Sequence, residues 1–261
     1  MDDLAPDSTD QKDRNFVVAL ARGLEILRCF GENEPVLTNS EISDRTGLPK
    51  ATVSRLTHTL CALEYLAADS RAGAYRLSAG VLHLGFSVLA AMDIGDRAKQ
   101  EMRKLRDGPN SYITVALAEQ HQLDAVYLAT SNSREGVTLA IRVGSRLPLF
   151  SSAIGRAILV GMSPEQVARV FELARSEGLE AEAHDSLAAA REEYATFGFC
   201  RAYGSWRSDV NGIAVPVHAL AGGFVYGLNV GGPAFRVKPK ELEAVYAPLL
   251  IRAAKTLSAQ A

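Results

Sequence analysis

Four side chains in the segment 49–63 have the types and spacing needed to bind phosphates or base edges. All four donate hydrogen bonds, and they fall on one face if the segment is helical: Lys50, Ser54, Arg55 and His58. The apolar residues recur at helical spacing on another side and predict a buried stripe: Val53, Leu56, Leu60 and Leu63. The pattern predicts an amphipathic helix with a cationic, hydrogen-bonding outer face.

The residues before this helix predict the element that holds it in place. Thr38 and Glu41 have the spacing of a capping box, so a short helix begins there, with Ile42 turned inward. That helix breaks at Thr46, because Gly47 suits the positive backbone angle of a sharp turn. Two helices joined by a tight turn, the second cationic near its N-terminus, are typical of a helix-turn-helix.

The residues after the same helix predict a small hairpin. Residues 65–68 and 74–77 are typical of strands, and residues 69–73 of the turn between them, with Arg71 at its tip and Arg76 beside it. A hairpin in this place is the wing of a winged helix. The alternative is an ordinary helical hairpin with a solvated polar face, and the wing favours the winged helix over it.

Two further helices flank this region. Residues 16–30 form the first, and its apolar residues fall on one side: Val17, Leu20, Leu24, Leu27 and Phe30. Residues 81–91 form a helix that is apolar on more than one face. We expect that helix to be buried on two sides, against its own domain and against a partner subunit. Its position directly after the wing makes it a linker.

Composition places the chain among globular proteins. It has 261 residues, of which 48% are hydrophobic and 22% charged, so two domains are expected. The net charge is only −2, but residues 49–76 carry four cations against two anions, whereas residues 1–13 carry five aspartates against one lysine. Residues 1–14 are therefore predicted to be a disordered acidic tail. A local basic face on a neutral protein predicts modest, salt-sensitive DNA affinity, which dimerisation would increase.

Cysteine usage and hydropathy predict a cytoplasmic protein. Cys29, Cys61 and Cys200 lie far apart and form no C-x-x-C pair, which favours buried free thiols in a reducing compartment. No basic region precedes an apolar run at the N-terminus, so no signal peptide is expected. The most apolar stretch, 81–92, is too short to span a bilayer, and no membrane partner is expected.

After Pro109 the pattern changes from helical to alternating. A charged helix at 96–106 comes before this change. The next elements are predicted as strands 112–118, 123–130 and 137–143, a loop 144–149, and helices 151–159 and 163–175. They are followed by a helix capped by Asp185 or Ser186 and ending at Phe197, a strand 199–203, a hairpin of 212–220 with 223–230, and a closing helix 239–258. Strands, then helices, then strands predict an α+β domain of the segment 93–261.

The second domain carries no motif of a known catalytic site. It has no nucleophile elbow, P-loop, dinucleotide fingerprint or zinc-protease motif, and the five histidines of the whole chain are scattered without ligand spacing. Two pairs of glutamates, Glu192 with Glu193 and Glu241 with Glu243, are interpreted as solvated helix faces. We therefore expect no enzyme activity, no cofactor and no metal.

A binding site is the better candidate, at the start of the helix 151–159. Ser151, Ser152, Ala153 and Ile154 would present unpaired backbone amides, and their small size lets a ligand approach. A helix N-terminus of this kind favours a carboxylate or a similar anion. The alternative is plain capping of the helix by a serine, and both interpretations stay open.

Three other residues are candidates for the same cavity. Tyr203 and Trp206 lie in a loop with several polar residues, although aromatic cover for the sheet is the alternative role. Asn229 interrupts an otherwise apolar strand, so it either satisfies a buried backbone group or faces a ligand.

Taken together and in order, these pieces resemble the IclR-type bacterial transcription regulators from about residue 16 to residue 258. The matching stretches are ARGLEIL at 21–27, TGLPKATVSRL at 46–56, YRL at 75–77, GSRLPL at 144–149, IGRA at 154–157, GIAVPV at 212–217 and GGP at 231–233. Each stretch is weak alone, and their order makes the resemblance specific.

The resemblance implies a winged helix-turn-helix at 15–78, a linker and dimerisation helix at 79–92, and a GAF-like effector-binding domain at 93–261. It implies a homodimer or a dimer of dimers that binds palindromic promoter DNA, as a repressor or an activator. Effectors in this family are small carboxylates or aromatic acids from catabolic pathways. Carried over by position, the ligand contacts are Ala153, Ile154, Ala202, Gly212, Asn229 and Gly231.

Several of these positions depart from the regulators that respond to glyoxylate or pyruvate. Those regulators resemble this chain but use a carboxylate, a thiol and two hydroxyls where it has Ala202, Gly212, Asn229 and Gly231. The changes enlarge the cavity and make it less polar. We therefore expect a bulkier effector, an aromatic carboxylate, with Asn229 holding a polar substituent and Trp206 or Tyr203 near the ring.

The expected DNA contacts follow from the helix and the wing. The outer face of the helix would lie in the major groove with six residues toward the DNA: Lys50, Ala51, Thr52, Ser54, Arg55 and His58. Arg71 and Arg76 in the wing would contact phosphate. The rival hypothesis is an enzyme or small-molecule binder whose N-terminal domain mediates only protein contacts.

Overall fold

The structure is a computed structural model that describes residues 15–31, 34–69, 73–92, 94–135, 141–219 and 223–258. It divides into two compact units, Met1–Ala90 and Ala91–Ala261. The acidic tail predicted for residues 1–14 and the predicted wing residue Arg71 lie outside the described residues.

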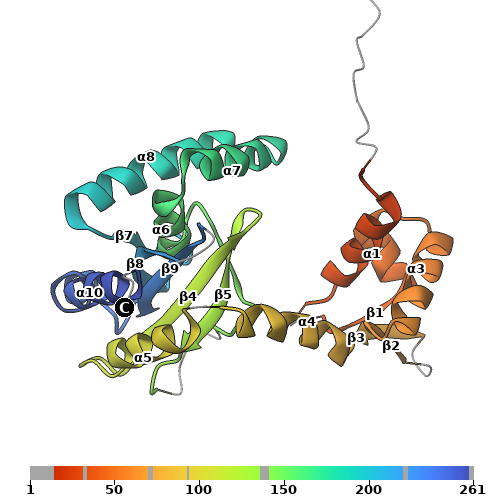
Figure 1. The fold of residues 1–261 in the computed structure, drawn as a ribbon, viewed down its shortest axis with the longest axis horizontal. Helices are drawn as coiled ribbons and strands as arrows, with labels where there is room; N and C mark the ends of the chain where they lie inside the picture. The colour runs from red at the N-terminus through yellow and green to blue at the C-terminus, as the bar shows by residue number, and fades with distance from the viewer. Residues whose placement is uncertain are drawn as a thin grey trace, which may run out of the picture. The chain divides into compact units, whose positions relative to one another are not determined.

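The first unit is a winged helix. Its elements are α1 (Val18–Arg28), β1 (Val36–Thr38), α2 (Asn39–Thr46), α3 (Lys50–Ala62), β2 (Leu66–Asp69), β3 (Ala74–Leu77) and α4 (Ala79–Ala90) (Figure 1). The helix-turn-helix and the wing are confirmed. Sequence reasoning missed β1, which pairs with β3 and makes the sheet three-stranded, in the order β1-β3-β2.

Local signals set the geometry of the helix-turn-helix. The backbone N–H of Thr38 donates to Glu41 Oε2 at 2.7 Å, and the N–H of Glu41 donates to Thr38 Oγ1 at 3.3 Å, so the predicted capping box is present. Gly47 has a φ of 66°, which a residue with a side chain rarely adopts. The turn therefore fixes where α3 begins.

The buried stripe predicted for α3 is wrong at its last residue. Val53, Thr57 and Leu60 are buried and Leu56 is half-buried, whereas Leu63 is 60% exposed. The helix ends at Ala62, so Leu63 leaves the helical face.

The apolar sides of α1 and α4 are not buried within the chain. Ile26 is the buried residue of α1, while Leu20 and Leu24 on its predicted apolar side are exposed. No residue of α4 is buried in the single chain, so the expected burial against its own domain is wrong, and the expected burial against a partner subunit stays a prediction.

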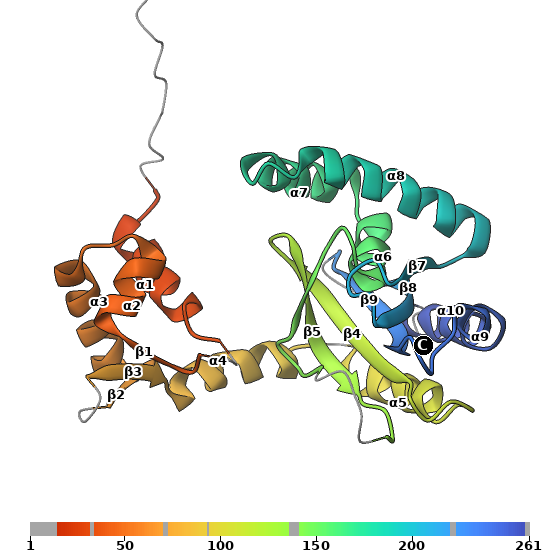
Figure 2. The same cartoon turned by 180° about the vertical axis from the view of Figure 1, so that it is seen from behind.

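The second unit is a six-stranded antiparallel sheet with helices on both faces. The strands lie in the order β6-β5-β4-β9-β8-β7. Their bounds are β4 (Thr114–His121), β5 (Asp124–Ser131), β6 (Arg146–Pro148), β7 (Cys200–Tyr203), β8 (Val210–His218) and β9 (Val225–Pro233). Figures 1 and 2 show α6 (Ala153–Gly161), α7 (Pro164–Ser176) and α8 (Glu180–Phe197) on one face, and α5 (Gly95–Arg106) and α10 (Ala247–Ser258) on the other. The α+β fold class is confirmed.

Several predicted bounds in this unit are wrong. Residues 141–143 of the predicted strand 137–143 are not in a strand, and 136–140 lie outside the described residues. The predicted loop 144–149 contains β6, because Leu147 is buried and Arg146 forms an ion pair with Asp124. The helix expected to begin at 185 or 186 begins at Glu180, directly after a turn in which Gly178 has a φ of 73°.

The closing helix is also interrupted. It consists of α9 (Pro239–Glu241), a π-helical turn (Leu242–Tyr246) and α10. The hairpin of β8 and β9 is confirmed by pairing from Val210 with Pro233 to His218 with Val225. The predicted turn at 221–222 lies outside the described residues.

The two faces of this sheet differ in side-chain size. In β4, Val115 and Leu117 belong to the core shared with α5 and α10, whereas Ala116 and Ala118 belong to the core shared with α6. The small residues let α6 lie close to the sheet: a Cβ added to Gly227 would lie 2.9 Å from the backbone oxygen of Ile154. No single helix in the described part of the chain is both long and apolar enough to cross a membrane.

Candidate functional site

The outer face of α3 is open to solvent. Five of the six residues predicted to face DNA are exposed, and Thr52 is half-buried: Lys50, Ala51, Ser54, Arg55 and His58 are the exposed ones. No acidic residue occurs in α3, so the face is cationic. Arg76 is exposed on β3, where its Nη1 donates to the carbonyl of Leu77 at 3.3 Å.

A groove between α1 and α3 adds a residue that sequence reasoning did not assign. Its volume is about 740 Å³, and it is lined by Ala19, Arg22, Thr52, Ser54, Arg55, Leu56, His58 and Thr59. Arg22 comes from α1, so the cation lies beside the exposed face of α3. The contact between the two helices is the signal that would have identified it, and that contact is not visible in the sequence.

The second unit contains a cavity between the N-terminus of α6 and the sheet. Four residues that are neighbours in the strand register form a row across it: Ala202 pairs with Gly212, Gly212 with Gly231, and Gly231 with Thr114. Three of these residues have at most a methyl side chain, so nothing fills the space above them. The volume of the cavity is about 30 Å³.

The structure brings most of the predicted effector residues to this cavity. The eight that line it are Ser152, Ala153, Ile154, Ala202, Trp206, Gly212, Asn229 and Gly231. Ser151 and Tyr203 are not among its lining residues. The Tyr203 hydroxyl instead donates to Glu243 Oε1 at 2.9 Å, and burial together with this hydrogen bond raises the Tyr203 pKa.

The first turn of α6 resolves the choice between capping and ligand binding for one serine. The Ser152 hydroxyl accepts from the N–H of Gly155 at 3.1 Å and donates to the carbonyl of Pro148 at 2.6 Å, so capping is correct for this side chain. The N–H groups of Ala153 and Ile154 belong to the first turn and have no partner within the helix. Two amides of the helix N-terminus are therefore left for an anion.

Seven lining residues were not predicted: Thr114, Tyr127, Ile141, Leu147, Val210, Asn211 and Gly232. Two of the polar ones are satisfied within the protein, because Thr114 Oγ1 accepts from the N–H of Ser133 at 3.2 Å and Asn211 Nδ2 donates to the carbonyl of Val237 at 2.9 Å. The alternation of the strand predicted at 123–130 places Tyr127 on the same face as Ala125, and that is the signal that could have found it.

Tyr127 and Asn229 each have a buried polar atom that lacks a hydrogen-bond partner. The Tyr127 hydroxyl and the Asn229 side-chain oxygen are buried, and neither has a hydrogen-bond partner among the described residues. Burial raises the pKa of Tyr127, and the neighbouring Asn229 side chain offsets part of that rise without meeting hydrogen-bond geometry. The hydroxyl is therefore neutral and able to donate.

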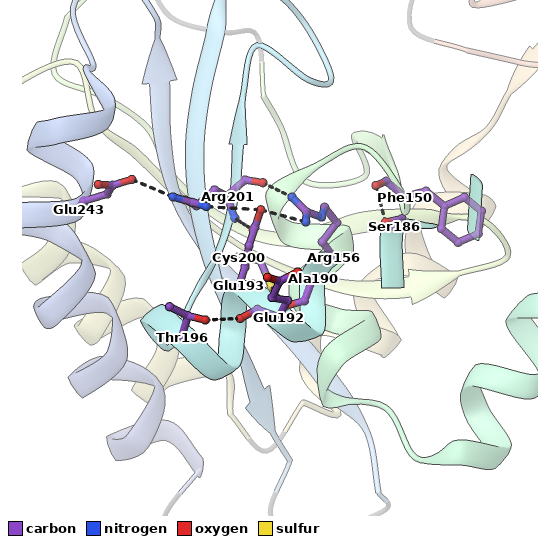
Figure 3. Close-up of polar contacts among 10 residues, drawn as sticks. All are labelled: Phe150, Arg156, Ser186, Ala190, Glu192, Glu193, Thr196, Cys200, Arg201 and Glu243. Carbon is purple, nitrogen blue, oxygen red and sulfur yellow. Dashed lines mark hydrogen bonds and ion pairs between the residues drawn. The ribbon is translucent and has the colours of Figure 1, made fainter. Parts of the chain in front are cut away.

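A polar network ties the cavity to the surrounding helices (Figure 3). Arg156 of α6 donates through Nη1 to the carbonyl of Arg201, the residue before Ala202, at 2.5 Å, and its Nη2 lies 3.2 Å from Glu193 Oε1 of α8. The N–H of Arg201 donates to Glu193 Oε2 at 3.0 Å.

This network corrects the interpretation of the glutamates. Glu193 and Glu243 are not simply solvated, since each lies within 4 Å of the Arg201 guanidinium. Glu241 accepts from Asn110 Nδ2 at 2.8 Å. Glu192 is exposed, as expected. In the part of the chain that the structure describes, no group of three or more potential metal ligands comes together.

A winged helix with an open cationic face and a separate α+β unit with a cavity at a helix N-terminus define the class of transcription regulators that read DNA and sense a ligand in one chain. Residues 19–70 match the IclR helix-turn-helix domain, and residues 86–259 match the bacterial transcriptional regulator IclR C-terminal domain. The chain belongs to the IclR family of transcriptional regulators, which bind DNA and are not enzymes.

Similar proteins match nearly the whole chain. The HTH-type transcriptional regulator TsaQ1/TsaQ2 of Comamonas testosteroni is 30% identical over 98% of this chain and 92% of its own. The Pca regulon regulatory protein of Pseudomonas putida is 31% identical over 95% and 85%. The crystal structure of an IclR family transcriptional regulator from Brucella abortus superposes with a TM-score of 0.83 at 40% identity, covering 96% of this chain and 94% of that one.

Proposed function

We propose that the protein regulates a catabolic operon in the cytoplasm, with promoter DNA bound by its winged helix and a small organic acid bound in the cavity of its second unit. One observation carries the proposal. The same chain has an exposed cationic face on α3 and, in a separate unit, a cavity lined by the first turn of α6, where the N–H groups of Ala153 and Ile154 have no partner within the helix. The first suits nucleic acid, and the second suits a carboxylate.

For DNA, α3 lies in the major groove of a palindromic site with six residues toward the bases and the backbone: Lys50, Ala51, Thr52, Ser54, Arg55 and His58. Arg55 contacts a base edge, because it lies in the middle of the exposed face, and Arg76 contacts phosphate from the wing. We propose the same phosphate role for Arg71.

The DNA assignment is tested by measuring the binding of three variants to the upstream intergenic DNA and to scrambled DNA. Arg55→Ala should lose about 1–3 kcal/mol of discrimination between the two. Arg76→Ala should weaken both alike and reduce the slope of log affinity against log salt by about one. Arg191→Ala, an exposed arginine of α8, is the control. Unchanged binding by both test variants contradicts the assignment.

For the effector, the N–H groups of Ala153 and Ile154 hold a carboxylate, and the apolar part of the acid lies over the row of small residues in the sheet. Apolar walls from Ile141, Leu147 and Trp206 favour an aromatic acid. Because a volume of about 30 Å³ holds roughly one water, an aromatic acid enters only if a wall moves. Trp206 is half-buried in a loop, and we propose that it is the residue that shifts.

For assembly, we propose a homodimer or a dimer of dimers. Four apolar residues of α4 are exposed in the single chain: Leu82, Leu84, Phe86 and Val88. Val18, Leu20 and Leu24 of α1 are exposed as well. Several large apolar side chains exposed on one helix favour a protein interface.

A further inference from the structure

Two buried polar groups face the cavity without partners in the described protein. Tyr127 is 1% exposed, and its hydroxyl has no hydrogen-bond partner. The side-chain oxygen of Asn229 is likewise buried and unpaired. Both residues line the cavity. An unsatisfied buried polar atom destabilises a folded protein, so the retention of two in one place needs a cause.

The positions directly paired with these two residues in the neighbouring strands carry no polar side chain. Asn229 of β9 is paired with Ala116 of β4 and with Ala214 of β8, and Tyr127 of β5 is paired with Ala118. The nearest strand neighbours are thus all alanines. The Asn229 amide lies next to the Tyr127 hydroxyl without hydrogen-bond geometry between them, so both groups are open to a polar atom placed in the cavity.

We propose that Tyr127 and Asn229 recognise a second polar group of the effector, a hydroxyl, in addition to the carboxylate held at α6. A hydroxyl donates to the Asn229 oxygen and accepts from the Tyr127 hydroxyl, so it satisfies both orphaned groups at once. An unsubstituted aromatic acid satisfies neither. The inference rests on the proposed effector site, and it narrows the effector class to hydroxylated aromatic acids.

A single buried water is the competing occupant, since a cavity of about 30 Å³ is the right size for one. Such a water would bridge the same two groups in the ligand-free protein. A hydroxyl of the effector replaces that water and reproduces its hydrogen bonds, which preserves affinity, whereas an unsubstituted ring displaces it without replacement. The two occupants therefore predict different responses to Tyr127→Phe.

The test is calorimetric titration of benzoate, 3-hydroxybenzoate and 4-hydroxybenzoate into the full-length protein. In the unmodified chain, at least one hydroxylated acid should bind about tenfold or more tighter than benzoate. In Tyr127→Phe that ratio should approach one, with the affinity for benzoate unchanged or higher. Asn229→Leu, a change of similar size at the second group, should reduce the same ratio. Tyr194→Phe is the control, because Tyr194 packs on the same core without lining the cavity.

Each result decides between explanations. If the acids bind and their ratio is the same in the unmodified chain, Tyr127→Phe and Asn229→Leu, the pair holds only a water and the inference fails, while the proposed effector site stands. If none of the three acids binds the unmodified chain, the proposed aromatic effector fails and the inference fails with it. Circular dichroism melting of each variant separates lost recognition from lost folding.

Discussion

Gly212 and Gly231 lie opposite each other in the floor of the cavity, yet they leave different amounts of room. A Cβ added to Gly212 would lie 3.5 Å from the carbonyl oxygen of Val230, which is ordinary contact. A Cβ added to Gly231 would lie 2.8 Å from the carbonyl oxygen of Asn211, which is too close. The same substitution therefore has different consequences at the two positions.

We predict that Gly212→Val folds normally and fills the cavity, whereas Gly231→Val is destabilised relative to it by about 1–3 kcal/mol, because backbone must move to admit the side chain. Urea denaturation of the two variants measures the difference. Equal stabilities would show that the two floor positions have the same space. Gly212→Val is then the variant that blocks the cavity without harming the fold.

Most of the predicted effector residues line the cavity, but Tyr127, which also lines it, was not predicted. The amides of Ala153 and Ile154 and the amide of Asn229 were found from a helix start and from a polar residue in an apolar strand. Tyr127 was missed because a tyrosine in a strand is ordinary. Its hydroxyl has no hydrogen-bond partner among the described residues, and the residue paired with it in β4 is Ala118, which depends on the strand register.

At the level of elements, local signals were predicted well and partner-dependent ones were not. The capping box at Thr38 and the turn at Gly47 act within a few residues, so the sequence contains all the information. The short strands β1 and β6 exist because another strand offers them a partner. Their three residues carry no periodic pattern that would predict them.

The helix α4 is an element whose predicted packing on its own domain is wrong. Its apolar residues were expected to be buried against its own domain and a partner, but none is buried in the single chain. The free energy of exposing such a face favours association. A second copy of the chain is the occupant that the proposed palindromic site requires.

We predict that Phe86→Glu shifts the protein from dimer toward monomer and weakens operator binding, because a buried charge opposes association. Sedimentation equilibrium gives the mass. Phe235→Glu is the matched control, since Phe235 and Phe86 are both 59% exposed and Phe235 belongs to the second unit. A monomeric mass for the unmodified chain, or an unchanged mass for Phe86→Glu, would contradict the proposed interface.

For the whole molecule, the proposed function requires that the cavity and the reading helix be coupled. Energetic coupling of two sites means that the acid changes the affinity for the operator, and a coupling of ordinary size changes it about fivefold or more. Hydrogen bonds and ion pairs among Arg156, Glu193 and Arg201 connect α6, whose N-terminus lines the cavity, to β7 and α8. A shift of α6 on binding would therefore move its neighbours.

The most direct measurement is the affinity of the full-length protein for fluorescently labelled operator, recorded by anisotropy while a panel of keto acids and benzoates is added. We predict that an aromatic acid changes the operator affinity of the unmodified chain about fivefold or more, and that Gly212→Val binds the operator equally well but does not respond. A response in Gly212→Val equal to that of the unmodified chain would contradict the claim that the effector acts from this cavity.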